Sequence, residues 1–368
     1  MKNRIFVDLH VIQTVPPSCV NRDDTGSPKT AMYGGVRRAR VSSQSWKKAI
    51  RDQFKEEFDE SELGIRTLNA VDVIADKIRS IDTALSKEEA VGKAAGVLRV
   101  AGIKLDTKKK KDTESEENLR TGALFFISSK QAENMAALAL TENYSKKDAQ
   151  EALNKGNGVD IALFGRMVAD DPSLNSDASA QVAHAISTHK VDTEYDYFTA
   201  IDDRSPADNA GAGMIGTVEF NSSTLYRYAT VSVHDLYNRL ECNKEMTSKA
   251  ITEFIKAFML SMPTGKQNTF ANRTVPNAAI IAIRDDQPIN LVSAFESPVG
   301  TNKSSIGYLD ESIDRLIKEK EEATSSFVKK SKKTWQIGKG LDALGPSADV
   351  ETTISEIEDY LNGELGEW

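Results

Sequence analysis

The chain has 368 residues, a hydrophobic fraction of 39% and a formal net charge of −8, so it can form a large core in one elaborated domain or two ordinary ones. It contains no apolar run approaching the roughly 18 residues of a membrane helix, no signal-peptide pattern, and only two cysteines, Cys19 and Cys242, without metal-ligand spacing. We therefore expect a cytoplasmic protein with no membrane partner and no cofactor, whose net negative charge excludes a general polycation but leaves room for a local basic groove.

The N-terminal segment is predicted to be a strand followed by a long loop. Residues 4–12 alternate with a period of two, and both faces are mostly apolar, which is typical of a strand packed on both sides. Residues 14–35 are rich in Pro, Gly, Asn and Asp and predict a loop. Loops of this length are usually functional or disordered. A short strand is expected over residues 36–41.

The segment SSQSWKKAIRDQFKEEF predicts an amphipathic helix that begins near Ser42 or Ser43, because either hydroxyl can cap a helix. Apolar side chains recur every four residues and predict a buried stripe of Trp46, Ile50, Phe54 and Phe58. A second face carries Lys47, Arg51 and Lys55, flanked by Gln44 and Lys48. The first turns of this helix therefore present cations where the helix dipole is positive.

The remainder of the chain predicts an α+β fold with insertions. Residues 59–155 are mostly helical in pattern, with a charged, solvated loop at 104–117. Residues 191–220 predict a long β-hairpin arm with a tip rich in Gly, Ala, Asp and Pro. A strand, an amphipathic helix and a buried strand follow, and the acidic tail from 341 to 368 predicts a short helix docked by an apolar edge.

The strongest functional signal is a concentration of positive charge. From Thr25 to Arg51 there are seven Lys or Arg residues and no Asp or Glu, although the chain as a whole is acidic. Lys and Arg supply charge to a phosphate backbone, while Ser, Gln and backbone N–H groups position phosphates. We therefore predict a nucleic-acid-binding groove here, and the alternative is an ordinary solvated helix face.

Three other motifs favour structural roles over chemistry. GAGMIG, residues 211–216, matches the dinucleotide-binding pattern, but it has a polar loop before it and TVEF after it, so it predicts a hairpin tip. His184 and His189 lie five apart and do not share a helical face, so they do not form a zinc pair. Asp23 and Asp24 are adjacent carboxylates that suit Mg²⁺, but Asp is also a common turn former.

Two apolar side chains are candidates for contact with bases. Met167 follows Gly165 and Arg166 in FGRMV, and Phe198 lies near the base of the predicted arm in YDYFTA. Such side chains can stack on bases or wedge between them. Burial in the core is the equally weighted alternative.

Several long blocks of the sequence resemble the CasC family, the backbone subunit of the type I-E CRISPR effector complex Cascade. The longest is PPSCVNRDDTGSPKTAMYGGVRRARVSSQSWKKAIR, residues 16–51. Others are GVDIALFGRM, AHAISTHKVDTEYDYFTAIDD, GTVEFNSSTLYRYA, PTGKQNTF and SAFESPV, in the order of the family. Residues 60–155 and the chain from Thr301 onward diverge from it.

The resemblance implies an RRM-like (ferredoxin-like) palm with a helical fingers insertion and a β-hairpin thumb. The corresponding ranges are residues 1–58, 183–192 and 223–368 for the palm, 59–182 for the fingers and 193–222 for the thumb. It implies a non-catalytic protein that forms a filament of several copies along the spacer of the CRISPR RNA. The copies kink the RNA at regular intervals and leave the bases between free to pair with target DNA. Implied further partners are Cascade subunits of the CasA, CasB, CasD and CasE types.

The resemblance also implies the residues that contact the RNA. In the palm they are Arg22, Lys29, Gln44, Ser45, Lys47, Lys48, Arg51 and, in a separate loop, Lys266. In the fingers they are Arg166 and Met167, and on the thumb they are Phe198 and Thr199. No catalytic or metal-binding residue is implied.

Two alternatives to this function stay open from the sequence. A related kind of backbone subunit cleaves target RNA with a metal and a loop aspartate, for which Asp23 or Asp24 is the candidate. A general RRM-type RNA-binding protein outside CRISPR systems is the other.

Overall fold

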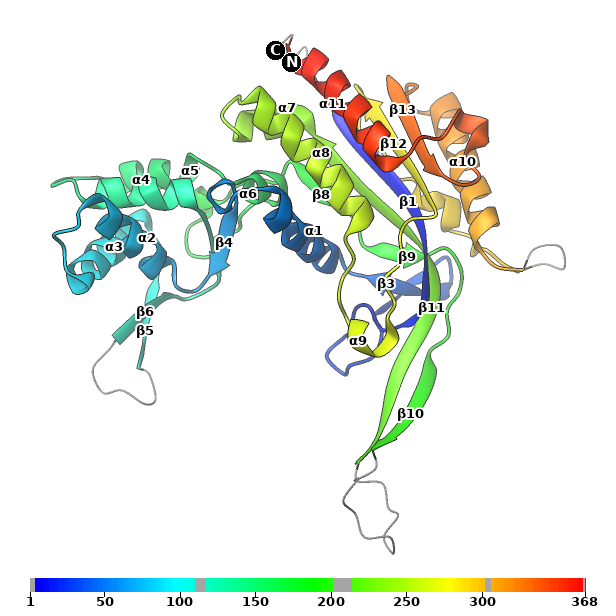
Figure 1. Ribbon diagram of the computed structural model, residues 1–368, viewed down its shortest axis with the longest axis horizontal. Helices are drawn as coiled ribbons and strands as arrows, with labels where there is room; N and C mark the ends of the chain where they lie inside the picture. Colours follow the sequence, from blue (N-terminus) through cyan, green and yellow to red (C-terminus); the bar gives the residue numbers. More distant parts are fainter. Residues whose placement is uncertain (1–3, 110–116, 201–213, 302–305, 367) are drawn as a thin grey trace, which may run out of the picture. The chain divides into compact units, whose positions relative to one another are not determined.

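The computed structural model describes residues 4–109, 117–200, 214–301, 306–366 and 368 (Figure 1). These residues form an antiparallel sheet and eleven α-helices, so the predicted α+β class is confirmed. Within these ranges no helix combines the length and the apolar character needed to cross a membrane.

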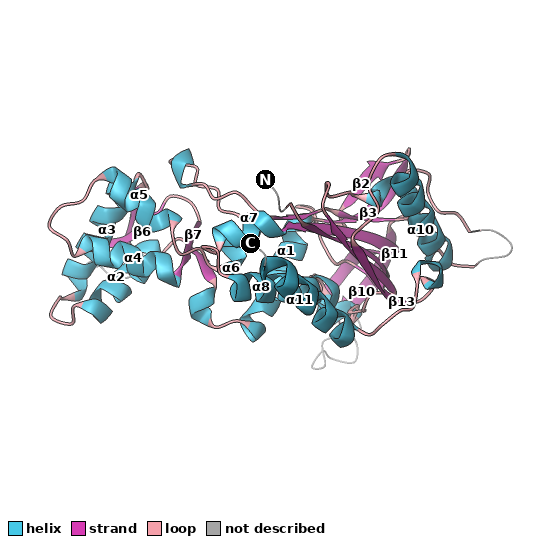
Figure 2. Ribbon diagram, turned by 90° about the horizontal axis from the view of Figure 1, so that it is seen from above, coloured by secondary structure: helices cyan, strands magenta, loops and turns pink. Residues whose placement is uncertain are grey.

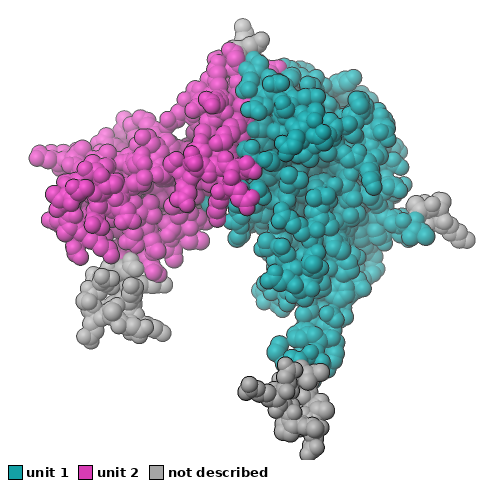
Figure 3. Space-filling model, in the orientation of Figure 1, with its two compact units in different colours: residues 1–53, 182–230, 252–363 teal, residues 54–181, 231–251, 364–368 magenta. Residues whose placement is uncertain are grey.

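The chain folds into two compact units, which Figure 3 shows in different colours. Unit 1 comprises residues 1–53, 182–230 and 252–363, and unit 2 comprises residues 54–181, 231–251 and 364–368. The predicted ranges put 223–368 in a single part, whereas residues 231–251 group with unit 2. There the Ser232 N–H donates to Ser179 O (2.8 Å), and the Gly156 N–H donates to Glu241 Oε1 (2.8 Å).

Unit 1 is built on a sheet, drawn in magenta in Figure 2. Its main path has the strand order β13-β12-β1-β11-β9-β3-β2, while β8 and β10 pair with β11 beside it. The strands along the path are β13 (Lys333–Gly338), β12 (Ala278–Arg284), β1 (Phe6–Ser18), β11 (Met214–Ser232), β9 (Ala185–Ser187), β3 (Val36–Val41) and β2 (Thr30–Tyr33). The remaining two are β8 (Ala180–Val182) and β10 (Glu194–Ala200). Strand β1 pairs antiparallel with β12, from Phe6 opposite Arg284 to Ile12 opposite Ala278.

Both faces of this sheet are covered, as the side chains of β11 demonstrate. Arg227 points to one face, where its guanidinium carbon lies 3.7 Å from the Trp46 ring centroid and 4.6 Å from that of Phe258. These two rings belong to α1 (Ser43–Glu57) and α8 (Lys244–Leu260). The neighbouring Tyr226 and Tyr228 point to the opposite face, into a core shared with α10 (Leu309–Ser326).

Strand β1 extends to Ser18, beyond the strand expected over residues 4–12 and into the predicted loop. Its later part includes Pro16 and Pro17, which cannot donate to a sheet ladder. Side chains from a distant segment bind this part instead: Thr14 N–H donates to Asn277 Oδ1 (2.8 Å), and Thr274 Oγ1 donates to Thr14 O (2.8 Å). A local sequence pattern does not contain that information.

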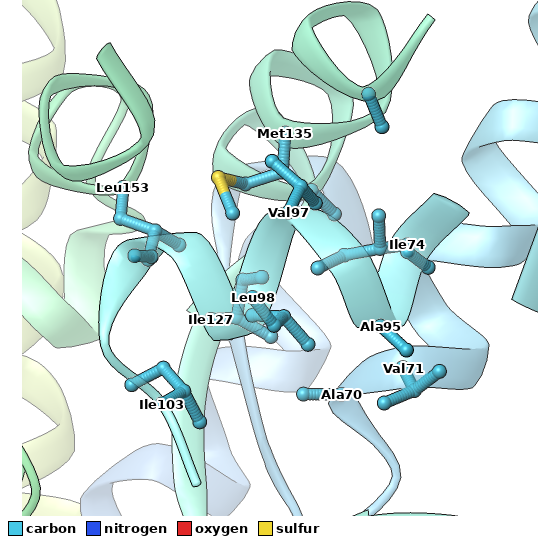
Figure 4. Packing of buried hydrophobic residues seen from close by; sticks show 14 of the residues in the cluster. Ala70, Val71, Ile74, Ala95, Val97, Leu98, Ile103, Ile127, Met135 and Leu153 are labelled. Atoms are coloured by element: carbon cyan, nitrogen blue, oxygen red, sulfur yellow. The ribbon is translucent and has the colours of Figure 1, made fainter. Parts of the chain in front are cut away.

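Unit 2 has a helical core of its own (Figure 4). Its helices include α2 (Ala70–Ile81), α3 (Lys87–Ala101), α4 (Ser129–Ala139), α5 (Lys146–Asn154), α6 (Val159–Phe164) and α7 (Val233–Arg239). Fully buried side chains such as Ile74, Leu98 and Met135 fill the space between α2, α3 and α4. Three of the helices begin with capping boxes, at Ser86, Ser128 and Ser145.

Unit 2 also contains two small sheets, which the helical prediction for residues 59–155 missed. Strand β4 (Gly64–Thr67) pairs with β7 (Phe125–Ser128), and β5 (Leu105–Lys109) pairs with β6 (Glu117–Thr121). The second pair corrects the solvated loop predicted at 104–117 for residues 105–109 and Glu117, and residues 110–116 lie outside the described residues. Its strands are highly charged, so pairing between neighbouring backbones, and not an apolar pattern, defines them.

The arm of unit 1 is a two-stranded hairpin. Strand β10 pairs antiparallel with the start of β11, from Glu194 opposite Phe220 to Ala200 opposite Met214. Residues 201–213, which include the predicted tip and the first half of the GAGMIG motif, lie outside the described residues. The C-terminal helix α11 (Val350–Gly366) agrees with the helix predicted in the acidic tail, and Ile357, Leu361 and Leu365 are its buried edge.

Candidate nucleic-acid interface

The first turn of α1 is fixed by three side chains of unit 1. Ser42 caps the helix, because its Oγ accepts from the Ser45 N–H (3.3 Å). The Ser42 N–H donates to Asn21 Oδ1 (2.9 Å), and the Ser43 N–H donates to His184 Nδ1 (3.1 Å). The helix start is therefore tied both to the loop after β1 and to the segment before β9.

The predicted buried stripe of α1 is confirmed, since Trp46, Ile50, Phe54 and Phe58 are each at most 6% exposed. The polar residues lie on the other faces. Gln44 and Lys48 are exposed, while Ser45, Lys47 and Arg51 are half-buried. Lys48 forms an i,i+4 ion pair with Asp52 (2.5 Å), so part of its charge is balanced within the helix.

The loop after β1 is a closed turn that carries Arg22 and Lys29. Lys29 N–H donates to Asn21 O (2.8 Å), and Arg22 and Pro28 form an isolated antiparallel bridge. Asp23 Oδ1 accepts from the backbone N–H of Thr25 (3.0 Å) and of Ser27 (3.0 Å) and from the Thr25 hydroxyl (2.7 Å). These bonds lower the pKa of Asp23, the hydroxyl of Thr25 contributing most. Asp23 thus forms the turn, and the neighbouring Asp24 is exposed.

A narrow recess of about 20 Å³ lies between this loop, β3 and β11, and it is lined in part by Lys29, Arg40 and Asn221. Asn221 is 7% exposed. Within the described part of the chain its Nδ2 has no hydrogen-bond partner. Burial lowers the pKa of His184, and the charges of Arg40 and Lys29 lower it further, so the three side chains are neighbours. An unpartnered donor beside two cations favours an anionic ligand.

The Lys266 loop is held against the end of β1. A Cβ on Gly265 would lie 2.0 Å from Val20 O, so only glycine permits this approach. Lys266 itself has a left-handed backbone (φ 50°) at the start of α9 (Gln267–Phe270). Burial raises the pKa of the Cys19 thiol, and the charges of Arg22 and Lys266 oppose that shift. Arg22 and Lys266 therefore both lie near the Cys19 thiol.

The arm carries Phe198 and Thr199 on opposite faces of β10. The Phe198 ring covers Gly216 on the paired strand, where a Cβ would lie 2.4 Å from its Cζ, and Thr199 is exposed. Tyr195, Tyr197 and Ile215 are each more than 60% exposed on the Thr199 face. At the base of the arm, Phe220 packs against Phe270 of the Lys266 loop with ring centroids 5.8 Å apart.

Two of the predicted site residues, Arg166 and Met167, belong to unit 2, and they differ sharply in exposure to solvent. Met167 is 83% exposed, which favours contact with a ligand over burial in the core. Arg166 is 4% exposed. Its guanidinium donates to Leu174 O (3.0 Å), Leu153 O (3.1 Å) and Gln131 Oε1 (3.1 Å). The structure therefore corrects the predicted contact of Arg166 with RNA, because this side chain binds the protein interior and holds the segment that presents Met167.

His189, the other member of the histidine pair, is buried in unit 1. Its ring stacks on Tyr308 with centroids 3.7 Å apart, and its Nε2 accepts from the Thr224 N–H (3.0 Å). The structural role expected of His189 agrees with these contacts.

Unit 1 thus joins the segments that carry most of the predicted side chains, although these segments are far apart in the sequence. The start of α1, the loop after β1 and the Lys266 loop meet around the end of β1. Sequence reasoning missed Arg40, His184 and Asn221 as members of this surface, and for Arg40 the excess of cations from Thr25 to Arg51 was an available signal. Within the described residues no group of three or more His, Cys, Asp or Glu side chains is arranged to hold a metal ion.

Comparisons with known proteins show which chains this one is similar to. A family model described as CT1975-like protein matches residues 7–362. A solved chain of a complex described as "CRISPR RNA-guided surveillance complex, pre-nicking" is 31% identical, with a TM-score of 0.81 over 96% of this chain and 100% of that one. A chain of a second "CRISPR RNA-guided surveillance complex" is 27% identical, with a TM-score of 0.70 over 95% and 99%. No match was found among curated proteins.

Proposed function

Because the chain belongs to the family of CT1975-like proteins, we propose that it is an RNA-binding subunit of a CRISPR RNA-guided surveillance complex. More narrowly, it is the CasC-type backbone subunit of a type I-E complex. It holds the CRISPR RNA and presents it for pairing with target DNA in antiviral defence, in the cytoplasm.

The observation that carries this proposal is the end-to-end similarity to a surveillance-complex chain, at 31% identity over 96% of this chain. The family model spans residues 7–362, a range that contains the cation-bearing loop after β1, the start of α1 and strands β10 and β11. The basic surface of unit 1 gives the similarity a physical basis, since it lies on a protein of net charge −8. Acidity elsewhere confines RNA to this surface.

In this function the surface recognises the RNA backbone, not its sequence. Arg22, Lys29, Lys47 and Arg51 contact phosphates, and the Nδ2 of Asn221 donates to a phosphate or sugar oxygen. Sequence specificity is delegated to base pairing between guide and target, so contacts to phosphate, sugar and shape are sufficient. Phe198, Thr199 and Met167 contact the bases where the RNA is kinked.

We extend the proposal to the fold and the assembly. The strand and helix sequence β1–α1–β9–β11–α8–β12, with β12, β1, β11 and β9 as successive neighbours, supports an RRM-like palm. Unit 2 supplies the fingers and the β10–β11 arm the thumb. Several copies align along the spacer, and subunits of the CasA, CasB, CasD and CasE types complete the complex.

The subunit is proposed to be non-catalytic. Asp23 supports this, because its Oδ1 accepts three hydrogen bonds within its own turn and it is therefore explained as a turn former. Cleavage of a guide-complementary RNA in the presence of Mg²⁺, lost in Asp23→Ala or Asp24→Ala, would instead establish the alternative of a target-cleaving backbone subunit.

Replacing Lys47 or Arg51 with alanine should weaken RNA binding about tenfold each, a loss of ~1.4 kcal/mol. The loss should be similar for all RNA sequences, and the slope of log K against log salt should fall by about 0.7 per variant, as for one lost contact to a single strand. The measurement is fluorescence anisotropy with a spacer-length RNA at several salt concentrations. Lys318→Ala on α10 is the matched control, and an unchanged slope in both groove variants would contradict the proposal.

The assembly is tested by expressing the chain with its partner subunits and a CRISPR array, and by sequencing the RNA that co-purifies. We expect one RNA species with repeat-derived ends and several copies of this chain bound to it. Heterogeneous RNA would favour a general RRM-type RNA-binding protein instead.

A further inference from the structure

The turn between α10 and β13 carries a second concentration of positive charge. From Phe327 to Lys339 there are five lysines and no Asp or Glu. Phe327, Lys329, Lys330 and Lys332 are exposed, and the Phe327 side chain is 88% exposed. The exposed ring and the lysines beside it are therefore both accessible to a ligand.

The backbone of this turn is fixed from below by the end of β12. The Arg284 guanidinium, only 6% exposed, donates to Lys329 O (3.0 Å), to Gln287 O (2.8 Å) and to Asp286 Oδ2 (2.7 Å). Lys329 N–H donates to the same carboxylate oxygen (3.1 Å), and Lys332 N–H donates to Ile283 O (2.8 Å). These hydrogen bonds fix the backbone that carries Phe327 and the lysines beside it.

Cations also converge beneath the turn. A recess of about 20 Å³ is lined by Arg284, Lys320, Thr324 and Ser331, and also by the carboxyl of Asp8. Burial lowers the pKa of Lys320, and the charges of Arg284 and Lys330 lower it further, against an opposing effect of Glu321. Asp286 is paired with Arg284, so an anion bound at the turn would be attracted chiefly by Lys320 and Lys330.

The turn lies at the opposite end of β1 from the groove of the proposed function, which is formed by the loop after β1, the start of α1 and the Lys266 loop. Arg284 pairs with Phe6 at the start of β1, whereas the groove surrounds the residues after Ser18 at its end. At about 3.3 Å per residue, this strand separates the two places by roughly 40 Å.

We propose that the α10–β13 turn is a second nucleic-acid site, which binds a single strand by stacking a base on Phe327 and contacting phosphates with Lys329 and Lys330. An unpaired strand is favoured because a base inside a duplex offers no free face to an exposed ring. Phosphate is favoured because compact cations and hydroxyls, and not an apolar groove, surround the ring.

The test uses the full chain carrying one equivalent of unlabelled spacer-length RNA and separated from free RNA, so that the groove is occupied and no excess strand competes for the turn. Binding of fluorescein-labelled dT12 and rU12 is then measured by anisotropy at several salt concentrations. Phe327→Ala should weaken binding about tenfold, and Phe327→Trp should retain it. Lys329→Ala and Lys330→Ala should each weaken it about threefold and lower the salt slope. Comparison of dT12 with rU12 shows whether the strand is DNA or RNA.

Lys339→Ala is the matched control, because Lys339 belongs to the same cation-rich stretch but follows the other end of β13. Equal binding by wild type and the turn variants, or no binding of either oligonucleotide to the RNA-saturated chain, would overturn the second site. Loss of a protein partner in Phe327→Ala without loss of oligonucleotide would assign the turn to protein docking instead. If the proposed function were wrong, the chain would not retain the spacer-length RNA in the first step, and this outcome is observed before any oligonucleotide is added.

Discussion

Replacing Arg38 with alanine should lower the free energy of unfolding by about 4 kcal/mol, because it removes a buried cation on which three segments of unit 1 converge. Arg38 is 0% exposed. Its guanidinium donates to Tyr33 O (3.1 Å), Ser187 O (3.1 Å), Thr188 O (2.6 Å), Phe295 O (2.8 Å) and Glu296 O (3.3 Å). Alanine leaves a cavity and these carbonyls without their donor.

Arg37 is the matched control, since it precedes Arg38 on the same strand and is exposed. Arg37→Ala should change the free energy of unfolding by no more than about 0.5 kcal/mol. Arg38→Lys should recover only a fraction of the loss, because an ammonium group cannot reproduce the planar fork of donors. Urea unfolding followed by circular dichroism measures all three variants. Similar stabilities for Arg37→Ala and Arg38→Ala would contradict the structural role of Arg38.

Arg37 and Arg38 show which part of the basic surface could be predicted from the sequence and which part could not. The seven cations from Thr25 to Arg51 correctly located a cationic region, but the sequence did not distinguish Arg38, which binds carbonyls inside the protein, from its exposed neighbour. The difference arises because Phe295 and Glu296 cover one face of β3. They lie more than 250 positions further along the chain, and no local pattern encodes such a contact.

The periodicity of apolar residues predicts a helix or strand most reliably where one regular face of that element packs against a core. The stripe on α1, the alternation of β1 and the strand over 36–41 all follow from burial of a regular face. The hairpin of β5 and β6 and the proline-containing end of β1 were missed, because backbone pairing and distant side chains stabilise them. Arg166 was placed with the RNA-binding residues for a related reason: its burial depends on α4 and α5, which the family resemblance did not cover.

Replacing Asp8 with asparagine should stabilise the protein at pH 8 by about 3 kcal/mol. Asp8 is buried in β1, and burial raises its pKa to about 6, although Thr230, the Ile289 N–H and Tyr228 act in the opposite direction. The pKa of this carboxyl rises from 3.8 to about 6 on folding. At pH 8 it is ionised in the folded protein, and each tenfold weakening of its acidity on folding then costs about 1.4 kcal/mol of stability. Asparagine retains an acceptor for the Ile289 N–H without that charge.

His10, two residues along the same strand, has the opposite effect on stability. Burial lowers its pKa to about 3, assisted by the charges of Lys320 and Arg284. His10 therefore folds neutral, and its contribution to stability is present above pH 6.5 and is lost as the pH falls towards 3. Asp8 contributes stability below pH 3.8 that is lost as the pH rises through about 6. Between pH 4 and 6 the two effects are opposite in sign and nearly cancel.

Each single substitution should therefore reveal the pH dependence of the free energy of unfolding that the other residue causes. In Asp8→Asn, the free energy of unfolding should rise by about 1.4 kcal/mol for each pH step of one from pH 4 to 6, relative to wild type, because only the unfolded chain then takes up a proton at His10. In His10→Gln it should fall by a similar amount over each step, because only the folded chain keeps a proton on Asp8. Urea unfolding at pH 4, 5, 6 and 8 measures both slopes, and the double variant should restore the flat profile of the wild type. Parallel pH profiles of the free energy of unfolding in all four proteins would mean that neither side chain changes its protonation on folding. Asp8 and His10 would then affect stability only through their contacts with neighbours such as Tyr226 and Tyr228.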